Sequence, residues 1–278
     1  MRLTEVERAF VVAAAGASAG SRGVWRAAVL LARTGCPDAD PDRVESLLEG
    51  LAGAVRRTGL DPADAEGRAR VLAGALSGRL RGDGETYDDP RNSCLECVLD
   101  RGLGIPITLS LAWMEAARRR GWSVEGIGLP GHFVVRVLGR EGDGALADPF
   151  HGGRVLTRAA VLALLREVHG RPVRLRPRDL EPVRPRDLLV RLLRNLRSSY
   201  RRRGDRERGL AVAEAMLLVA PGLPEGLRDR GLLRLRGGDR AQGLADLRAF
   251  LARDPPAPGA AEVLRLVETL TDDAELPN

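Results

Sequence analysis

The side chains of this chain that are best suited to catalysis or metal binding belong to two cysteines, two histidines and an aspartate. Cys94 and Cys97 form a C-x-x-C pair in "NSCLEC", His132 stands in "GHFVVR", and Asp148 and His151 stand in "ADPFHGG". Cysteine, histidine and aspartate in that order suggest a thiol hydrolase, in which the histidine and aspartate activate a thiolate. The same residue types are also metal ligands.

The cysteine pair, considered alone, favours packing over chemistry. A structural zinc site usually has four ligands, and here one C-x-x-C pair is accompanied by three scattered histidines. Cys94, Cys97 and Val98 follow helical spacing in an apolar pattern, where cysteine serves as a small core residue. We therefore expect structural cysteines, no metal ion and no cofactor. Completion of a metal site by Asp148 and His151 stays open, as does contact of one cysteine with His132.

Two predicted strands position the histidine and the aspartate. "HFVVRVL" is rich in β-branched residues, with Phe133 and Val135 on one face and His132 on the other, and "GALADPF" forms a further strand that ends at Asp148. If the two polar side chains touch, the aspartate fixes the imidazole tautomer and the other ring nitrogen acts as a base. Alternatively, His132 binds backbone and Asp148 caps the turn in "DPFHGG", and spacing alone favours this alternative.

The surrounding pattern predicts an α+β fold. Residues 1–84 read as a helical N-terminal region that packs on the core, because segments such as "RVESLLEGLAGAVRR" repeat apolar residues at helical spacing. Residues 85–170 read as a small core of two helices, short strands and a further helix. Residues 171–187, "RPVRLRPRDLEPVRPRD", read as an extended Arg/Pro-rich connector.

Residues 188–278 contain an internal repeat of 34 residues. This is the period of the tetratricopeptide repeat (TPR), a pair of antiparallel helices per unit, so we predict two TPR-like hairpins and a capping helix. Tyr200 is expected to pack between the helices of the first hairpin, Gly209 and Gly243 to lie where helices cross closely, and Arg234 to replace the tyrosine in the second. The recurring pairs are Gly204 and Gly238, Asp205 and Asp239, Gly209 and Gly243, Leu210 and Leu244, and Pro221 and Pro255.

The distribution of charge says less about function than the motifs do. All 44 basic residues are arginine, and between Arg171 and Arg208 the 14 arginines exceed the five acidic residues by nine. A nucleic-acid surface is one interpretation, but Tyr200 is the only aromatic residue in the stretch, so base stacking is unsupported and we do not expect nucleic acid as a partner. The N-terminus lacks the basic start of a signal peptide and no apolar run is long enough to span a membrane, so we expect a cytoplasmic protein without membrane contact.

A longer motif carries a family resemblance. "DPRNSCLECVLDRGLGIPITLSLAWMEAARRRGWSVEGIGLPGHFVVRV", followed by "ADPFHGGRVLT", resembles the SirB-type transglutaminase-like proteins of bacteria, and an F-box-only protein of animals carries a related domain. The resemblance implies a papain-like core with a short antiparallel sheet, in which a cysteine at the start of the central helix meets histidine and aspartate from the following strands. These correspond to His132 and Asp148. The cysteine position falls on Pro106, which has no nucleophilic atom.

The resemblance therefore implies a degenerate catalytic site. Thr108 and Ser110 follow in the same helix and, with His151, complete a possible pocket. The implied function is that of a non-catalytic transglutaminase-like and TPR protein, which binds a protein or peptide partner through its TPR-like region in a regulatory role. One alternative is a hydrolase or amide-processing enzyme that uses His132 and Asp148, with water or Ser110 in place of the thiol. Another is a basic-surface nucleic-acid binder.

Overall fold

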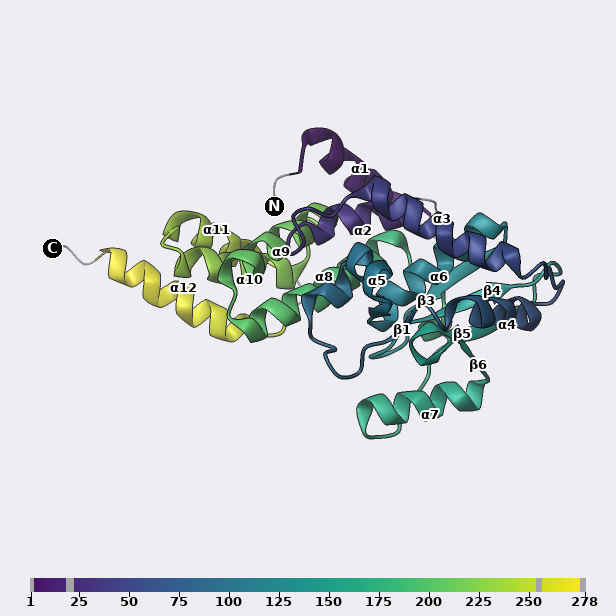
Figure 1. The fold of residues 1–278 in the computed structure, drawn as a ribbon. Helices are drawn as coiled ribbons and strands as arrows, with labels where there is room; N and C mark the ends of the chain where they lie inside the picture. The colour runs from purple at the N-terminus through teal and green to yellow at the C-terminus, as the bar shows by residue number, and fades with distance from the viewer. Residues whose placement is uncertain (1–2, 19–22, 254–256, 276–278) are drawn as a thin grey trace. The chain divides into compact units, whose positions relative to one another are not determined.

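The chain folds into two compact units (Figure 1). The computed structural model describes residues 3–18, 23–253 and 257–275, with side chains described as far as residue 271. Unit 1 is Met1–Leu196 and unit 2 is Arg197–Asn278, so the division falls inside one helix, α8 (Pro185–Arg203). Pro255, the last position of the predicted repeat, lies outside the described residues.

The first part of unit 1 is helical, as predicted. Asp40 and Asp64 each accept a hydrogen bond from a backbone N–H in the first turn of the helix that follows them, and Thr4 and Glu7 form a reciprocal capping box. The third of these helices packs against the central helix of the unit, and the fourth contacts the sheet. The helices are α1 (Glu5–Gly16), α2 (Val24–Ala32), α3 (Pro41–Arg57) and α4 (Ala65–Leu76).

The central helix of unit 1, α6 (Pro106–Arg120), is buried along most of its length. Pro106 occupies its first turn, where the missing N–H of proline costs no hydrogen bond, and Gly121 ends it with φ 90°. A 3₁₀ turn, η1 (Pro90–Ser93), and α5 (Leu95–Arg101) precede it. The strands β1 (Arg81–Gly82) and β2 (Leu103–Gly104) form a short parallel pair, which places the loop after β1 beside the start of α6.

A four-stranded antiparallel sheet follows in the order β3-β4-β5-β6. Helices α4 and α6 contact one face, where the Phe133 ring and the Met114 sulfur fill the space beside Gly126. On the other face Val134 and Leu156 join the buried residues of α7 in one cluster. This confirms the alternation read from "HFVVRVL". The elements are β3 (Val124–Ile127), β4 (Val134–Leu138), β5 (Gly144–Asp148), the 3₁₀ turn η2 (Pro149–His151), β6 (Arg154–Leu156) and α7 (Arg158–His169).

The Arg/Pro-rich segment, residues 171–187, packs onto the sheet side of unit 1. Leu175 is buried in the α7 cluster, and a 3₁₀ turn, η3 (Pro177–Leu180), follows it. Pro182 forms a bridge to Ile127, and the Val183 N–H donates to the Gly126 carbonyl at 2.8 Å. The segment is therefore attached along β3, although its composition suggests an extended connector.

Unit 2 consists of helical hairpins, as the 34-residue period predicts. Tyr200 is buried, and a Cβ on Gly243 would lie 3.0 Å from the carbonyl oxygen of Gly231, so two helices do cross closely there. At Gly209 the approach is looser than predicted, since an added Cβ would meet Leu233 only at 3.6 Å. The helices after α8 are α9 (Arg206–Val219), α10 (Pro224–Arg236), α11 (Arg240–Leu251) and α12 (Ala260–Glu275).

The second hairpin replaces aromatic packing with an ion cluster around a buried aspartate. Arg234, which stands where the first repeat has Tyr200, donates to the carboxylate of Asp246 at 2.9 Å, and Arg230 binds the same carboxylate through two contacts of 2.6 and 2.8 Å. Asp246 is only 6% exposed. In the described ranges, no helix has both the length and the apolar character that a bilayer crossing requires.

Candidate functional site

His132 and Asp148 meet in the interior of unit 1. His132 lies in the turn before β4, where its N–H donates to the Leu129 carbonyl at 3.2 Å, and Asp148 is the last residue of β5. The His132 Nε2 and the Asp148 Oδ2 are 3.0 Å apart, and the two side chains are 4% and 0% exposed. The contact between the two side chains, which spacing alone did not favour, is therefore present, and it is enclosed by protein.

Asp148 also caps the turn that follows it. Its Oδ1 accepts the backbone N–H groups of Phe150 and His151 at 3.0 and 3.4 Å, and its Oδ2 contacts the His151 Nδ1 at 2.7 Å. Both interpretations of "DPFHGG" thus hold at once. Burial acts to raise the pKa of Asp148, but the hydrogen bonds and charges of His132 and His151 outweigh it and hold that pKa below its ordinary value.

An ionised Asp148 fixes how the two imidazoles are protonated. A carboxylate only accepts hydrogen bonds, so His132 donates through Nε2 and His151 donates through Nδ1. In the neutral His132 ring this leaves Nδ1 as the acceptor, which is the arrangement that a general base needs. His132, Asp148 and His151 are also close enough together to share a metal ion.

Aromatic rings surround the histidine pair. The His132 ring lies 5.6 Å from the His151 ring in a stacked arrangement and 5.9 Å from the Phe150 ring edge-on. Tyr87 reaches the same group from the loop before α5, with its ring centroid 6.2 Å from that of Phe150. Burial raises the pKa of the Tyr87 phenol, and the positive charge of Arg191 opposes this. Only 3% of the chain is aromatic, and two of these residues, Tyr87 and Phe150, lie on one side of the histidine pair.

Arg191 holds the backbone of the His132 turn in place. From α8 its Nη2 donates to the carbonyls of Leu129, at 2.8 Å, and His132, and its guanidinium lies 5.4 Å from the centroid of the Phe133 ring. Burial lowers the pKa of Arg191. The sequence places this arginine in a basic stretch, and no signal in the stretch separates it from its solvent-exposed neighbours.

The start of α6 offers no available nucleophile. Pro106 is the first residue of the helix and its side chain is hydrocarbon. The Thr108 hydroxyl donates to the Asn92 carbonyl at 2.7 Å, and the Ser110 hydroxyl lies 3.5 Å from the Phe133 carbonyl. Thr108 and Ser110 are both 0% exposed. These hydroxyls therefore stabilise packing around α6.

A buried polar network attaches the loop before α5 to this helix start. Asp83 accepts from the Thr86 N–H and hydroxyl at 2.8 and 2.5 Å, and from the Asn92 Nδ2 at 3.0 Å, while Arg101 lies 3.5 Å away. Burial acts to raise the pKa of Asp83, yet these donors lower it to about 2. Because the Asn92 carbonyl also accepts from the Thr108 hydroxyl, the network attaches the segment "DPRNS" to the first turn of α6.

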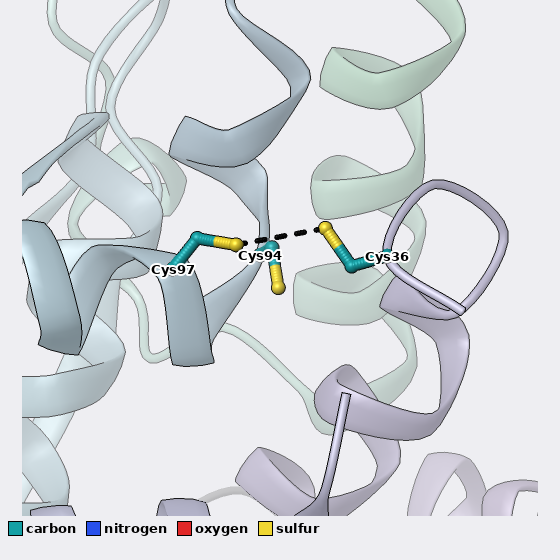
Figure 2. A group of neighbouring side chains, drawn as sticks. All are labelled: Cys36, Cys94 and Cys97. Atoms are coloured by element: carbon teal, nitrogen blue, oxygen red, sulfur yellow. Dashed lines mark hydrogen bonds between the residues drawn. The ribbon is translucent and has the colours of Figure 1, made fainter. Parts of the chain in front are cut away.

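The cysteines of the C-x-x-C pair meet a third cysteine. Figure 2 shows Cys36, from the segment between α2 and α3, beside Cys94 and Cys97, with the Sγ atoms of Cys36 and Cys97 3.6 Å apart. The three sulfur atoms all lie within 4.8 Å of one another. Cys94 occupies the position before α5 instead of lying inside the helix, which begins at Leu95, and its side chain makes no capping hydrogen bond. Within the described ranges, neither sulfur of the pair is hydrogen-bonded to His132.

The environments of the three thiols differ. The sulfur atoms of Cys36 and Cys97 share a hydrogen bond in which either can be the donor. The neighbouring thiols of Cys36 and Cys94 and the positive charges of Arg101 and Arg91 favour the Cys97 thiolate, so the pKa of Cys97 is lowered. The neighbouring thiols of Cys36 and Cys97, together with burial, raise the pKa of Cys94. Sequence reasoning missed Cys36, which lies far from the pair along the chain.

Comparison with known proteins identifies relatives over most of the chain. The family model described as "Transglutaminase-like superfamily" matches residues 42–194, and the one described as "Tetratricopeptide repeat" matches residues 196–269. A UPF0162 protein of Xylella fastidiosa is 38% identical over 236 residues, which cover 82% of this chain and 83% of that protein. A UPF0162 protein of Pseudomonas aeruginosa is 30% identical over 253 residues, 89% of each chain. Protein SirB1 of Salmonella typhimurium is 26% identical over 176 residues, which cover 63% of this chain and 65% of that protein.

No solved structure matches this chain significantly. The boundary between the two family matches, at residues 194–196, coincides with the division between the two compact units. Both halves of the sequence-based identification are thereby confirmed.

Proposed function

The chain belongs to the transglutaminase-like superfamily, and we propose that it is a member that binds a partner protein and performs no catalysis itself. The observation that carries this proposal is Pro106 at the first position of α6. The resemblance puts the catalytic cysteine of active relatives there. Proline offers neither a thiol to attack a carbonyl nor an N–H to stabilise an oxyanion.

The side chains around Pro106 support the same conclusion. A substitute nucleophile would need a free lone pair beside a base and access to substrate. Thr108 and Ser110 are fully buried and bonded to backbone carbonyls, and His132 is only 4% exposed. A substrate could reach His151, whose side chain is 38% exposed, but would have to open the protein to reach His132 or Asp148.

Unit 2 provides a cavity suited to a partner segment. It has a volume of about 380 Å³ and lies between α8, α9 and α10. Apolar side chains, Leu232 and Leu233, form part of its wall. Arg201, Arg206 and Arg236 also line it, and none of the three forms an ion pair with another residue in the described ranges. Free guanidinium groups around an apolar floor fit a peptide with both acidic and apolar side chains.

The aspartates of the cavity do not cancel this charge. Asp229 is held by Arg197 at 3.0 Å and by Arg228 at 3.0 Å, and Asp205 caps α9 and pairs with Arg208 at 2.8 Å. Each carboxylate is thus already neutralised by its own arginine. The potential that an approaching peptide meets is positive.

Peptide binding by the full-length protein tests this proposal. The probe is a fluorescein-labelled peptide of alternating glutamate and leucine, compared with a peptide of glutamine and leucine, by fluorescence anisotropy. We expect binding of the acidic peptide only, weakened at least fivefold by Arg201→Ser with Arg236→Ser, because two contacts with carboxylates are lost. Arg248→Ser, an exposed arginine on α11, is the matched control and should leave binding unchanged.

Two results would contradict the assignment. Equal affinity for the acidic and the neutral peptide would remove the electrostatic argument. Tighter binding of a labelled single-stranded DNA of the same charge, with a steep loss of affinity in salt, would favour the nucleic-acid alternative.

The buried histidine–aspartate pair supports a second candidate function. Its geometry, 3.0 Å between His132 Nε2 and Asp148 Oδ2, is that of a general base with its orienting carboxylate, which would activate water to hydrolyse an ester or amide. A screen of peptide, amide and ester substrates should then show turnover that His132→Gln abolishes. Turnover that persists in His132→Gln, or no turnover at all, would eliminate this candidate.

A further inference from the structure

All three cysteines of the chain converge in one place, and we propose that they bind a thiophilic metal ion, Zn²⁺ or Cu⁺. The expectation of a metal-free protein rested on counting only the two ligands of the C-x-x-C pair. Cys36 supplies a third thiol from a different part of the sequence (Figure 2). Three thiolates suffice to hold zinc with one open position, and soft thiolate ligands select zinc and copper(I) over harder metals.

The distances between the sulfur atoms fit a metal centre. A zinc–sulfur bond of about 2.3 Å places neighbouring sulfur atoms of a tetrahedral site about 3.8 Å apart, and those of a trigonal site about 4.0 Å apart. The Cys36 and Cys97 sulfur atoms are 3.6 Å apart, and no pair in the cluster exceeds 4.8 Å. Binding therefore requires side-chain adjustments of well under 1 Å to each sulfur position.

A set of ion pairs holds the two segments together. Glu96, the residue before Cys97, accepts the Asp40 N–H at 2.7 Å and pairs with Arg43 at 2.6 Å. Arg43 also makes two contacts with Asp100, at 2.8 and 2.9 Å. These contacts fix the start of α3 to α5, and Cys36 lies just before that start. The ligands are thus preorganised by groups that are not ligands themselves.

Charge and access are also compatible with a bound ion. Three thiolates around Zn²⁺ leave one net negative charge, and around Cu⁺ two, and the partly exposed side of the cluster leaves this charge open to solvent. Cys94 is buried, whereas Cys36 and Cys97 are partly exposed. An ion can therefore enter from the side of Cys36 and Cys97 and keep a solvent molecule or an exogenous thiol as a further ligand.

Cobalt substitution tests the site in the full-length protein. Protein stripped of metal and kept reduced with a phosphine is titrated with Co²⁺, whose bonds to thiolate give a charge-transfer band in the near ultraviolet. We expect one equivalent of Co²⁺ per chain and displacement by Zn²⁺. Cys36→Ser and Cys97→Ser should each weaken binding more than tenfold. A parallel titration with Cu⁺ against a chromogenic chelator shows which of the two ions binds more tightly.

The matched control separates this site from the histidine site. His151→Ala, which removes a potential ligand beside Asp148, should leave the cobalt band and the stoichiometry unchanged, and far-ultraviolet circular dichroism should show that every variant is folded. The proposal is wrong if reduced protein with three titratable thiols gives no thiolate band. It is also wrong if Cys36→Ser and Cys97→Ser retain the affinity while His151→Ala loses it, or if neither Zn²⁺ nor Cu⁺ displaces cobalt.

Discussion

Replacing Asp83 with asparagine should make the protein less stable in a manner that depends on pH. Asp83 is 5% exposed and accepts hydrogen bonds from Thr86 and Asn92, with Arg101 3.5 Å away. These donors lower the pKa of Asp83 from the ordinary value of 3.8 to about 2. The difference corresponds to about 2.4 kcal/mol, because each pKa unit is worth about 1.4 kcal/mol. Solvent near the loop screens part of this, so we expect about 1–2 kcal/mol.

The sign of the effect follows from linkage. The folded protein holds Asp83 ionised more strongly than the unfolded chain does, so its stabilisation is complete above about pH 4. As the pH falls from about 4 to about 2 the carboxylate is protonated and the contribution disappears. An asparagine does not titrate, so the free energies of unfolding of wild type and Asp83→Asn should converge in acid.

Urea unfolding measured between pH 2 and pH 6 gives these free energies. Other carboxylates titrate in the same range, and the difference between wild type and variant removes their contribution. Glu85→Gln, an exposed carboxylate in the same loop, is the matched control and should differ from wild type by less than about 0.5 kcal/mol at every pH. A difference between wild type and Asp83→Asn that stays constant from pH 6 to pH 2 would refute the reasoning.

Two further substitutions, one in each unit, test a close packing contact and an ion cluster. Gly82→Ala should cost about 1–3 kcal/mol in thermal unfolding, since its Cβ would lie 2.6 Å from the Phe150 carbonyl oxygen, whereas Gly84→Ala has open space and should cost less than about 1 kcal/mol. Equal losses in both variants would contradict the close approach. Asp246→Ala should cost about 1–3 kcal/mol, because it leaves two half-buried arginines without their shared carboxylate, while Glu268→Gln on the exposed face of α12 should be neutral. A neutral Asp246→Ala would show that the ion cluster does not stabilise the second hairpin.

The helices and strands of this fold follow from patterns among neighbouring residues, and the sequence predicts them well. The helices of residues 1–84, the alternation in β4 and the 34-residue period all arise from apolar residues that recur with the geometry of one helix or strand. The position of Pro106 at the start of α6 is likewise local, since proline is tolerated in the first helical turn. Each of these follows from neighbouring residues alone.

Residues that act through tertiary contacts could not be predicted in this way. Cys36 joins Cys94 and Cys97 only because α2, α3 and α5 pack together, and nothing near Cys36 in the sequence indicates a partner. Arg191 is one of 14 arginines in its stretch, and its burial against the His132 turn depends on where α8 runs. The division of the chain inside α8 likewise depends on which residues contact one another in the folded protein, so the amino-acid composition along the chain does not indicate it.

The buried histidine–aspartate pair does not by itself indicate catalysis. Asp148 ends β5 and caps η2 through two backbone N–H groups, so the fold needs an acceptor there whether or not a reaction occurs. Once that carboxylate is buried and ionised, its second oxygen needs donors, and His132 and His151 supply them. Removal of His132 would weaken the compensation of a buried charge and would be costly for stability alone. A superfamily member with proline at the first position of α6 can therefore retain the pair for its structural contribution, and only a loss of turnover beyond the loss of folded protein would assign it a chemical role.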